Sequence, residues 1–110
     1  MNQNGFYKIC KLGDLKEKEG RRFLVEDLDI ALFKVDGRIY ALNNICPHQH
    51  TNNIYEGFIE EGHIICPNHG WEFNLESGRI RSSGNGLDSY QVVVEGEDVF
   101  VKVYKKKNNW

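Results

Sequence analysis

Two short segments of this chain each offer one thiol and one imidazole, and they restrict what it can fold into more than any other feature. Cys46 and His48 are separated by one residue, and Cys66 and His69 by two. Seventeen residues lie between the two segments, enough for one hairpin. Because thiolate and imidazole are ligands for transition metals, the spacing predicts one metal centre held by two facing loops, with one Cys and one His from each.

Zinc also accepts sets of two Cys and two His ligands, so the metal must be argued from the spacing. Structural zinc sites usually take a Cys pair from one loop and a His pair, three to five residues apart, from a helix. Here each segment is mixed, and no helical pattern surrounds His69. The mixed pairs favour an iron-sulfur centre. Zinc, or a fold in which these side chains bind nothing, are the alternatives.

The segments and their surroundings resemble the Rieske iron-sulfur signature, most closely that of the soluble Rieske-type ferredoxins that supply ring-hydroxylating oxygenases. The run CPH, seventeen residues and the run CPNHGWEF carry the resemblance. The strand at 62–65, the turn at 76–78 and the closing hairpin at 90–103 follow the family order, so about four fifths of the chain is covered.

The resemblance implies a [2Fe-2S] cluster with Cys46, His48, Cys66 and His69 as its ligands, the two histidines replacing two cysteines on one iron. It also implies an electron-transfer protein that receives electrons from a flavoprotein reductase using NAD(P)H and passes them to a terminal oxygenase. The small Rieske-like subunit of an assimilatory nitrite reductase is the alternative. A scaffold module of the same fold without a cluster is a third possibility.

Length and composition restrict the function further. A chain of 110 residues with 40% hydrophobic content is expected to form one domain. Beyond the four ligand residues only His50 and His63 remain as histidines, so we expect no second iron site, no catalytic residues and no enzyme activity of its own. A net charge of −2 gives no indication of nucleic-acid binding.

The N-terminus lacks the basic and apolar regions of a secretory signal, and no apolar run reaches the ~18 residues of a membrane helix. We therefore expect a soluble, cytoplasmic protein that does not contact membranes, and a monomer. Cys10 is the remaining cysteine and is expected to be a reduced strand residue.

Short alternating apolar segments separated by Gly and Asp predict an all-β protein. Asp36-Gly37 is a signal for a two-residue hairpin turn. The fold implied by the resemblance is the Rieske fold, an antiparallel β-sandwich or partial barrel with an inserted cluster-binding subdomain. The base is expected at 1–43 and 87–110, and the subdomain at 44–86. Strands are expected at 6–10, 21–26, 28–35, 38–42, 55–59, 63–66, 71–74, 79–81, 90–94 and 99–103.

Overall fold

The computed structural model describes residues 5–45, 52–67, 70–80 and 86–103. Within these ranges the regular structure is almost all β, with two single-turn 3₁₀ helices, η2 (Leu12–Asp14) and η3 (Ile54–Glu56). No helix in this part of the chain is long and apolar enough to cross a membrane. The expected all-β class is confirmed.

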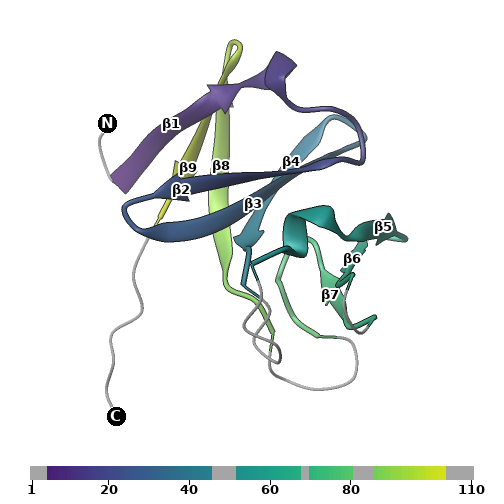
Figure 1. Ribbon diagram of the computed structural model, residues 1–110. Coiled ribbons are helices and arrows are strands. Elements are labelled where there is room, and N and C mark those ends of the chain that lie inside the picture. The colour runs from purple at the N-terminus through teal and green to yellow at the C-terminus, as the bar shows by residue number, and fades with distance from the viewer. Residues whose placement is uncertain (1–4, 46–51, 68–69, 81–85, 104–110) are drawn as a thin grey trace.

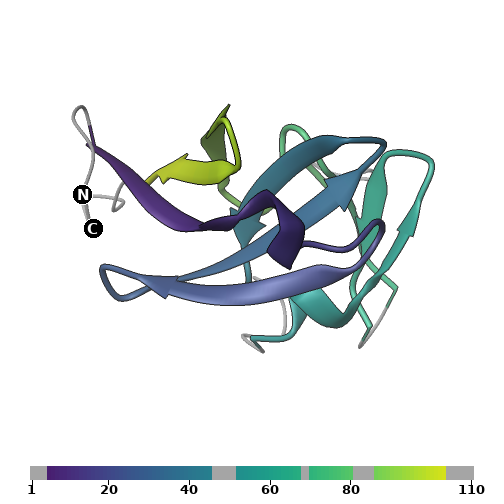
Figure 2. The same cartoon turned by 90° about the horizontal axis from the view of Figure 1, so that it is seen from above.

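A large antiparallel sheet forms the body of the molecule (Figure 1). Its six strands, in the order β1-β9-β8-β4-β3-β2, are β1 (Phe6–Lys11), β9 (Asp98–Lys102), β8 (Ser89–Glu95), β4 (Arg38–Asn43), β3 (Leu28–Val35) and β2 (Gly20–Val25). The sheet curls so that its edge strands, β1 and β2, approach each other, which is visible from the front and from above (Figures 1 and 2). The result is a partial barrel.

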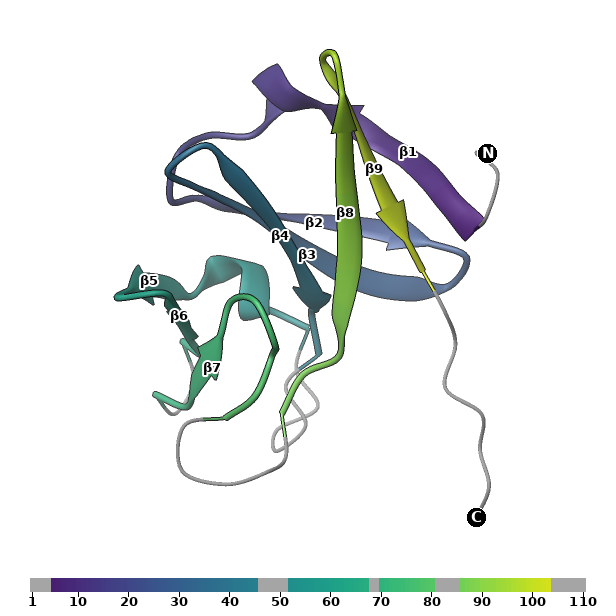
Figure 3. The ribbon, with the colours of Figure 1, turned by 180° about the vertical axis from the view of Figure 1, so that it is seen from behind.

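A smaller antiparallel sheet lies beside the partial barrel. Its strands are β5 (Phe58–Glu60), β6 (His63–Ile65) and β7 (Glu72–Asn74), with β6 in the middle. In sequence it lies between β4 and β8, two strands that pair directly through Ala41 with Tyr90 and Leu42 with Ser89. Seen from behind, the small sheet sits below and to one side of the large one (Figure 3). The second sheet is therefore an insertion between two neighbouring strands of the barrel.

Strand β3 is buried on both faces. Ile30 and Leu32 belong to the barrel core, the hydrophobic cluster of Leu15, Val25, Ile30, Leu32, Ala41, Tyr90, Val99 and Val101. The alternate residues Ala31 and Phe33 belong to the interface core, which comprises Ala31, Phe33, Leu42, Ile54, Ile64, Cys66, Phe73, Leu75, Ile80 and Leu87. Because side chains alternate along a strand, one strand supplies both cores and joins the barrel to the insertion.

Tight turns set the register of the hairpins. Asp36 and Gly37 both have positive φ, 51° and 81°, as a two-residue hairpin turn requires, so the predicted turn is confirmed. Glu26 and Asp27 form an equivalent turn between β2 and β3 with φ of 50° and 67°. The prediction that the strand extends through Glu26 is therefore wrong: the chain already reverses there.

The insertion contains less strand than predicted. The segment 55–59 is not one strand, because η3 occupies Ile54–Glu56 and β5 starts only at Phe58. Gly57 separates them, donating its N–H to the carbonyl of Ile54 at 2.9 Å and thereby closing the turn. Around 79–81, Arg79 and Ile80 form only isolated bridges, with Gly86 and Phe73, and residue 81 lies outside the described ranges.

Candidate metal centre

The segment that begins at Cys66 connects β6 to β7, and backbone hydrogen bonds join its two ends. The N–H of Cys66 donates to the carbonyl of Trp71 at 2.8 Å, and the N–H of Gly70 donates to the carbonyl of Cys66 at 3.0 Å. Gly70 has a φ of +75°, a conformation that favours glycine. The loop thus starts and ends at fixed points, and β6 pairs with β7 directly beyond it, residue Ile65 facing Glu72.

Cys66 itself is almost completely buried, with 1% of its surface exposed. It belongs to the interface core together with Ile64 and Phe73, and Trp71 packs against that core. Its thiol is not part of a disulfide. A buried cysteine in apolar surroundings is inert as a free thiol, but metal binding deprotonates a Cys ligand and compensates its charge. Cys66 therefore fits the role of a thiolate ligand to an iron-sulfur cluster.

The other three predicted ligands, Cys46, His48 and His69, lie outside the described residues, as does His50. Of the predicted set, the structure places Cys66 alone. Within the described ranges no three His, Cys, Asp or Glu side chains come together as a metal site. The four-residue ligand set remains a prediction from the sequence.

The residues on either side of 46–51 are described, and they are held close together. The side-chain amide of Asn44 donates to the carbonyl of Asn52 at 2.7 Å, and the N–H of Ile54 donates to the carbonyl of Asn44 at 3.2 Å. Ile54 then enters the interface core, which also contains Cys66. The segment that bears Cys46 and His48 therefore begins and ends on the side of the barrel against which the Cys66 loop packs.

Asn43 and Asn44, which precede Cys46, make supporting contacts that were not predicted from the sequence. Asn44 is fully buried and makes several hydrogen bonds to other segments. Asn43 receives the N–H of Ile45 on its side-chain oxygen at 2.8 Å, a local turn that directs the chain out of β4. The Asn-Asn pair just ahead of the first ligand segment was the available signal, but the partners of the Asn44 side chain lie eight to fifteen residues away and cannot be read from spacing.

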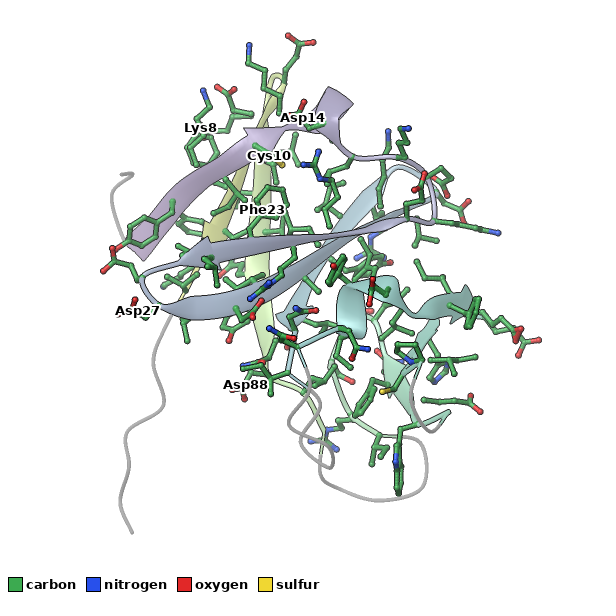
Figure 4. The ribbon with its side chains drawn as sticks, in the orientation of Figure 1. Lys8, Cys10, Asp14, Phe23, Asp27 and Asp88 are labelled. Atoms are coloured by element: carbon green, nitrogen blue, oxygen red, sulfur yellow. The ribbon has the colours of Figure 1, made fainter. Side chains whose placement is uncertain are left out.

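Cys10 lies apart from Cys66. It is half-buried on β1 and packs against the barrel core, whereas Cys66 belongs to the interface core. Burial raises the pKa of its thiol, and the negative charge of Asp14 raises it further against the opposing effect of Arg21. Figure 4 shows Cys10 and Asp14 close together where β1 leads into η2. A thiol with a raised pKa is a poor nucleophile at neutral pH, in keeping with the expected reduced strand residue.

Comparisons with known proteins agree with these features. The model of the Rieske [2Fe-2S] domain family matches residues 5–105. A relative from Xanthobacter autotrophicus, the ferredoxin component of an alkene monooxygenase system, is 33% identical over 97 residues, which are 87% of this chain and 80% of that protein.

Solved structures show the same fold. A chain from the complex of reduced oxygenase and oxidized ferredoxin in carbazole 1,9a-dioxygenase is 30% identical, with a TM-score of 0.81 over 97% of this chain and 100% of that chain. A nitrite reductase small subunit from Mycobacterium tuberculosis has a TM-score of 0.85 at 19% identity, over 92% of this chain and 96% of that one.

The matched range includes both ligand segments and every strand of both sheets, and the domain it describes holds a [2Fe-2S] cluster. The predicted cofactor and the predicted fold are both confirmed. This chain belongs to the Rieske [2Fe-2S] domain family.

Proposed function

We propose that this protein is a Rieske-type ferredoxin that carries single electrons from an NAD(P)H-dependent flavoprotein reductase to a terminal oxygenase. The strongest support for this proposal is the similarity to the ferredoxin component of an alkene monooxygenase system. The two sequences are 33% identical, and the match spans 80% of that protein. The chain has no catalytic residues in this proposal. Its function is to hold a cluster and to present it to two partners in turn.

The proposed ligands are Cys46, His48, Cys66 and His69. When bound, the cluster supplies a one-electron redox centre whose potential is higher than that of an all-Cys cluster, because two neutral imidazoles replace two thiolates. The protein fixes the ends of both ligand segments. It closes the Cys66 loop by backbone hydrogen bonds and excludes water from the Cys66 side with the interface core.

We further propose that the chain is one domain with a base at 1–43 and 87–110 and a cluster-binding subdomain at 44–86. The confinement of the second sheet to the interval between β4 and β8 supports this division. The two parts share the interface core, to which β3 and β4 contribute Ala31, Phe33 and Leu42. They are expected to unfold together.

The alternative, the small subunit of a nitrite reductase, is supported by the TM-score of 0.85 to such a subunit. At 19% identity this likeness shows the fold alone. The presence of all four ligand residues at family spacing favours the ferredoxin.

Analysis of the purified protein tests the proposal. Iron and acid-labile sulfide should each approach two per chain, and the reduced protein should give the paramagnetic signal of a [2Fe-2S] cluster with mixed Cys and His ligands. His48→Ala and His69→Ala should each abolish that signal. The protein should then restore NADH-dependent turnover of an oxygenase that has a reductase but no ferredoxin. Stoichiometric zinc without sulfide would refute the proposal, and electron delivery to a nitrite reductase flavoprotein alone would favour the alternative.

A further inference from the structure

A fully buried asparagine, Asn44, connects both ends of the segment that contains Cys46 and His48. Its side-chain nitrogen donates to the carboxylate of Asp29 at 3.0 Å and to the carbonyl of Asn52 at 2.7 Å. Its side-chain oxygen accepts the N–H of Tyr55 at 2.8 Å. Asn44 therefore binds β3 on one side and the chain beyond the segment on the other, eight and eleven residues later in sequence.

The backbone of Asn44 adds to this connection. Its N–H donates to the carbonyl of Asp29 at 2.8 Å, and its carbonyl accepts the N–H of Ile54 at 3.2 Å. The side chain and the main chain of one residue thus join Asp29 to three residues that follow the segment: Asn52, Ile54 and Tyr55.

The chemistry of these contacts requires an amide. The nitrogen faces two acceptors, a carboxylate and a carbonyl, while the oxygen faces a backbone donor. This pattern fixes which end of the side chain is nitrogen. An aspartate of the same shape could accept from Tyr55 but could donate to neither acceptor. It would also place a second carboxylate against Asp29.

Asp29 is itself held in place. Arg22 donates hydrogen bonds to its carboxylate from two nitrogens. Nε lies 2.9 Å from Oδ1 and 3.1 Å from Oδ2, and Nη2 lies 2.9 Å from Oδ2. Such a two-pronged pair fixes orientation as well as charge. Asp29 is 8% exposed, so its position in the barrel wall is well defined. Hydrogen bonds thus connect Arg22 on β2 with Asp29 on β3, and Asp29 with Asn44, which precedes the ligand segment.

We propose that Asn44 is a positioning residue for the cluster, holding the ends of the first ligand segment at the separation that brings Cys46 and His48 to the metal. The inference rests on the proposed function and adds to it a residue that is not a ligand. Asn44 acts through the backbone of Asn52 and Tyr55, with Asp29 and Arg22 as its support. Without the amide the bonds to Asn52 and Tyr55 are lost, only the backbone bond to Ile54 still joins the two ends, and the cluster is lost more readily.

The experiment compares the purified cluster-containing proteins. Asn44→Ala and Asn44→Asp remove the donors, and Asn44→Ser serves if either fails to fold. Val101→Ala is the matched control, because Val101 is fully buried in the barrel core on β9, away from both ligand segments. Each protein is exposed to an iron chelator at the same interval below its own melting temperature. Cluster loss is followed by the fading of visible absorption, and the paramagnetic signal of the reduced form is recorded.

The Asn44 variants should lose their cluster at least tenfold faster than Val101→Ala, with a broadened or shifted signal. Asp29→Asn should lose it at a rate close to wild type, because the remaining oxygen still accepts the Asn44 amide, although its melting temperature falls. Equal rates for the Asn44 variants and Val101→Ala, with unaltered signals, would overturn the inference while leaving the proposed function intact. A wild-type protein that holds no [2Fe-2S] cluster would instead refute the proposed function, and with it any role for Asn44 in holding one.

Discussion

Gly20 of β2 lies directly against the backbone carbonyl of Tyr55 in η3, so that a Cβ at Gly20 would collide with that oxygen and with the ring of Phe33. The contact joins the edge of the large sheet to the inserted segment. Tyr55 is also the residue whose N–H is held by Asn44. Because Gly20 has no side chain, the chain that follows the first ligand segment can approach the barrel closely.

We expect Gly20→Ala to destabilise the protein by about 1–3 kcal/mol, the usual cost of overpacking a filled site. Its φ is not in the left-handed region, so the effect comes from the collision and not from the backbone. Gly13→Ala is the control, since a Cβ there meets nothing within 4 Å. That control should change the stability by less than about 0.5 kcal/mol. Thermal unfolding of both variants measures the difference, and equal melting temperatures would contradict the predicted collision.

The sequence predicted most of the barrel because its strands are marked locally. The strand at 28–35 was predicted with its observed bounds, since an apolar run leads to an Asp-Gly turn there. The turn at Glu26 and Asp27 was missed because neither residue is glycine, although both have positive φ. The pairing of β2 with β3 determines the position of that turn.

The insertion was predicted less well because tertiary contacts shape it. Tyr55 and Phe58 favour a strand by their side chains, but Asn44 binds the N–H of Tyr55 and Gly57 closes a helical turn. The ligand types, by contrast, could be recognised from residue identity and spacing. The support around them could not, because Asn44 and Asp29 are fifteen residues apart and no periodic pattern connects them.

A second glycine pair separates backbone strain from packing. Gly78 and Gly62 have nearly the same φ, +77° and +78°, but only at Gly78 would a Cβ meet the carbonyl of Leu87. Gly62→Ala should lower the free energy of unfolding by about 1–2 kcal/mol, because an alanine is strained in a left-handed conformation. Gly78→Ala should cost about 1–3 kcal/mol more, because the collision adds to the same strain. Denaturant unfolding of the two variants gives the comparison, and similar midpoints would show that Leu87 moves aside freely.

The reactivity of Cys10 should depend on pH and on Asp14. Burial and the Asp14 charge raise the pKa of the thiol, so at neutral pH it is protonated and reacts slowly with a disulfide reagent. The rate should rise as the pH increases towards that raised pKa. Asp14→Asn removes the second cause, lowers the pKa and should make the reaction faster at a given pH.

Asp27→Asn is the control for a general change of charge, and Cys10→Ser measures the background from the other cysteines. Figure 4 shows Asp27 at the opposite end of β2 from Asp14, near the turn that joins β2 to β3. The reaction is followed on the cluster-containing protein. An Asp14→Asn rate equal to that of Asp27→Asn would show that Asp14 has no specific effect on Cys10.

The redox potential of the cluster should depend on Trp71 and Phe73. Both residues follow the second ligand pair in sequence, and neither has a hydroxyl that could donate a hydrogen bond to a cluster sulfur. Hydrogen bonds to the sulfurs raise the potential within the Rieske range. We therefore expect a midpoint near the lower limit of about −150 mV.

Phe73→Tyr tests the cause of the low potential. Phe73 is fully buried and pairs with Ile64 across β6 and β7, in the same core as Cys66. A new hydrogen bond worth about 0.5–1.5 kcal/mol more to the reduced cluster would raise the midpoint by about 20–65 mV, since a tenfold change corresponds to about 59 mV for one electron. Protein-film voltammetry measures the shift.

Phe33→Tyr is the matched control, because it adds the same hydroxyl at another fully buried phenylalanine of the interface core, on β3 instead of the Cys66 hairpin. It should lower stability, since a buried hydroxyl without a partner is costly, and leave the potential unchanged. If both variants shift the potential equally, polarity of the core and not a bond to sulfur is responsible. If the wild-type midpoint lies above about +100 mV, well inside the upper part of the Rieske range, then other donors replace the missing hydroxyls and the low-potential assignment is wrong.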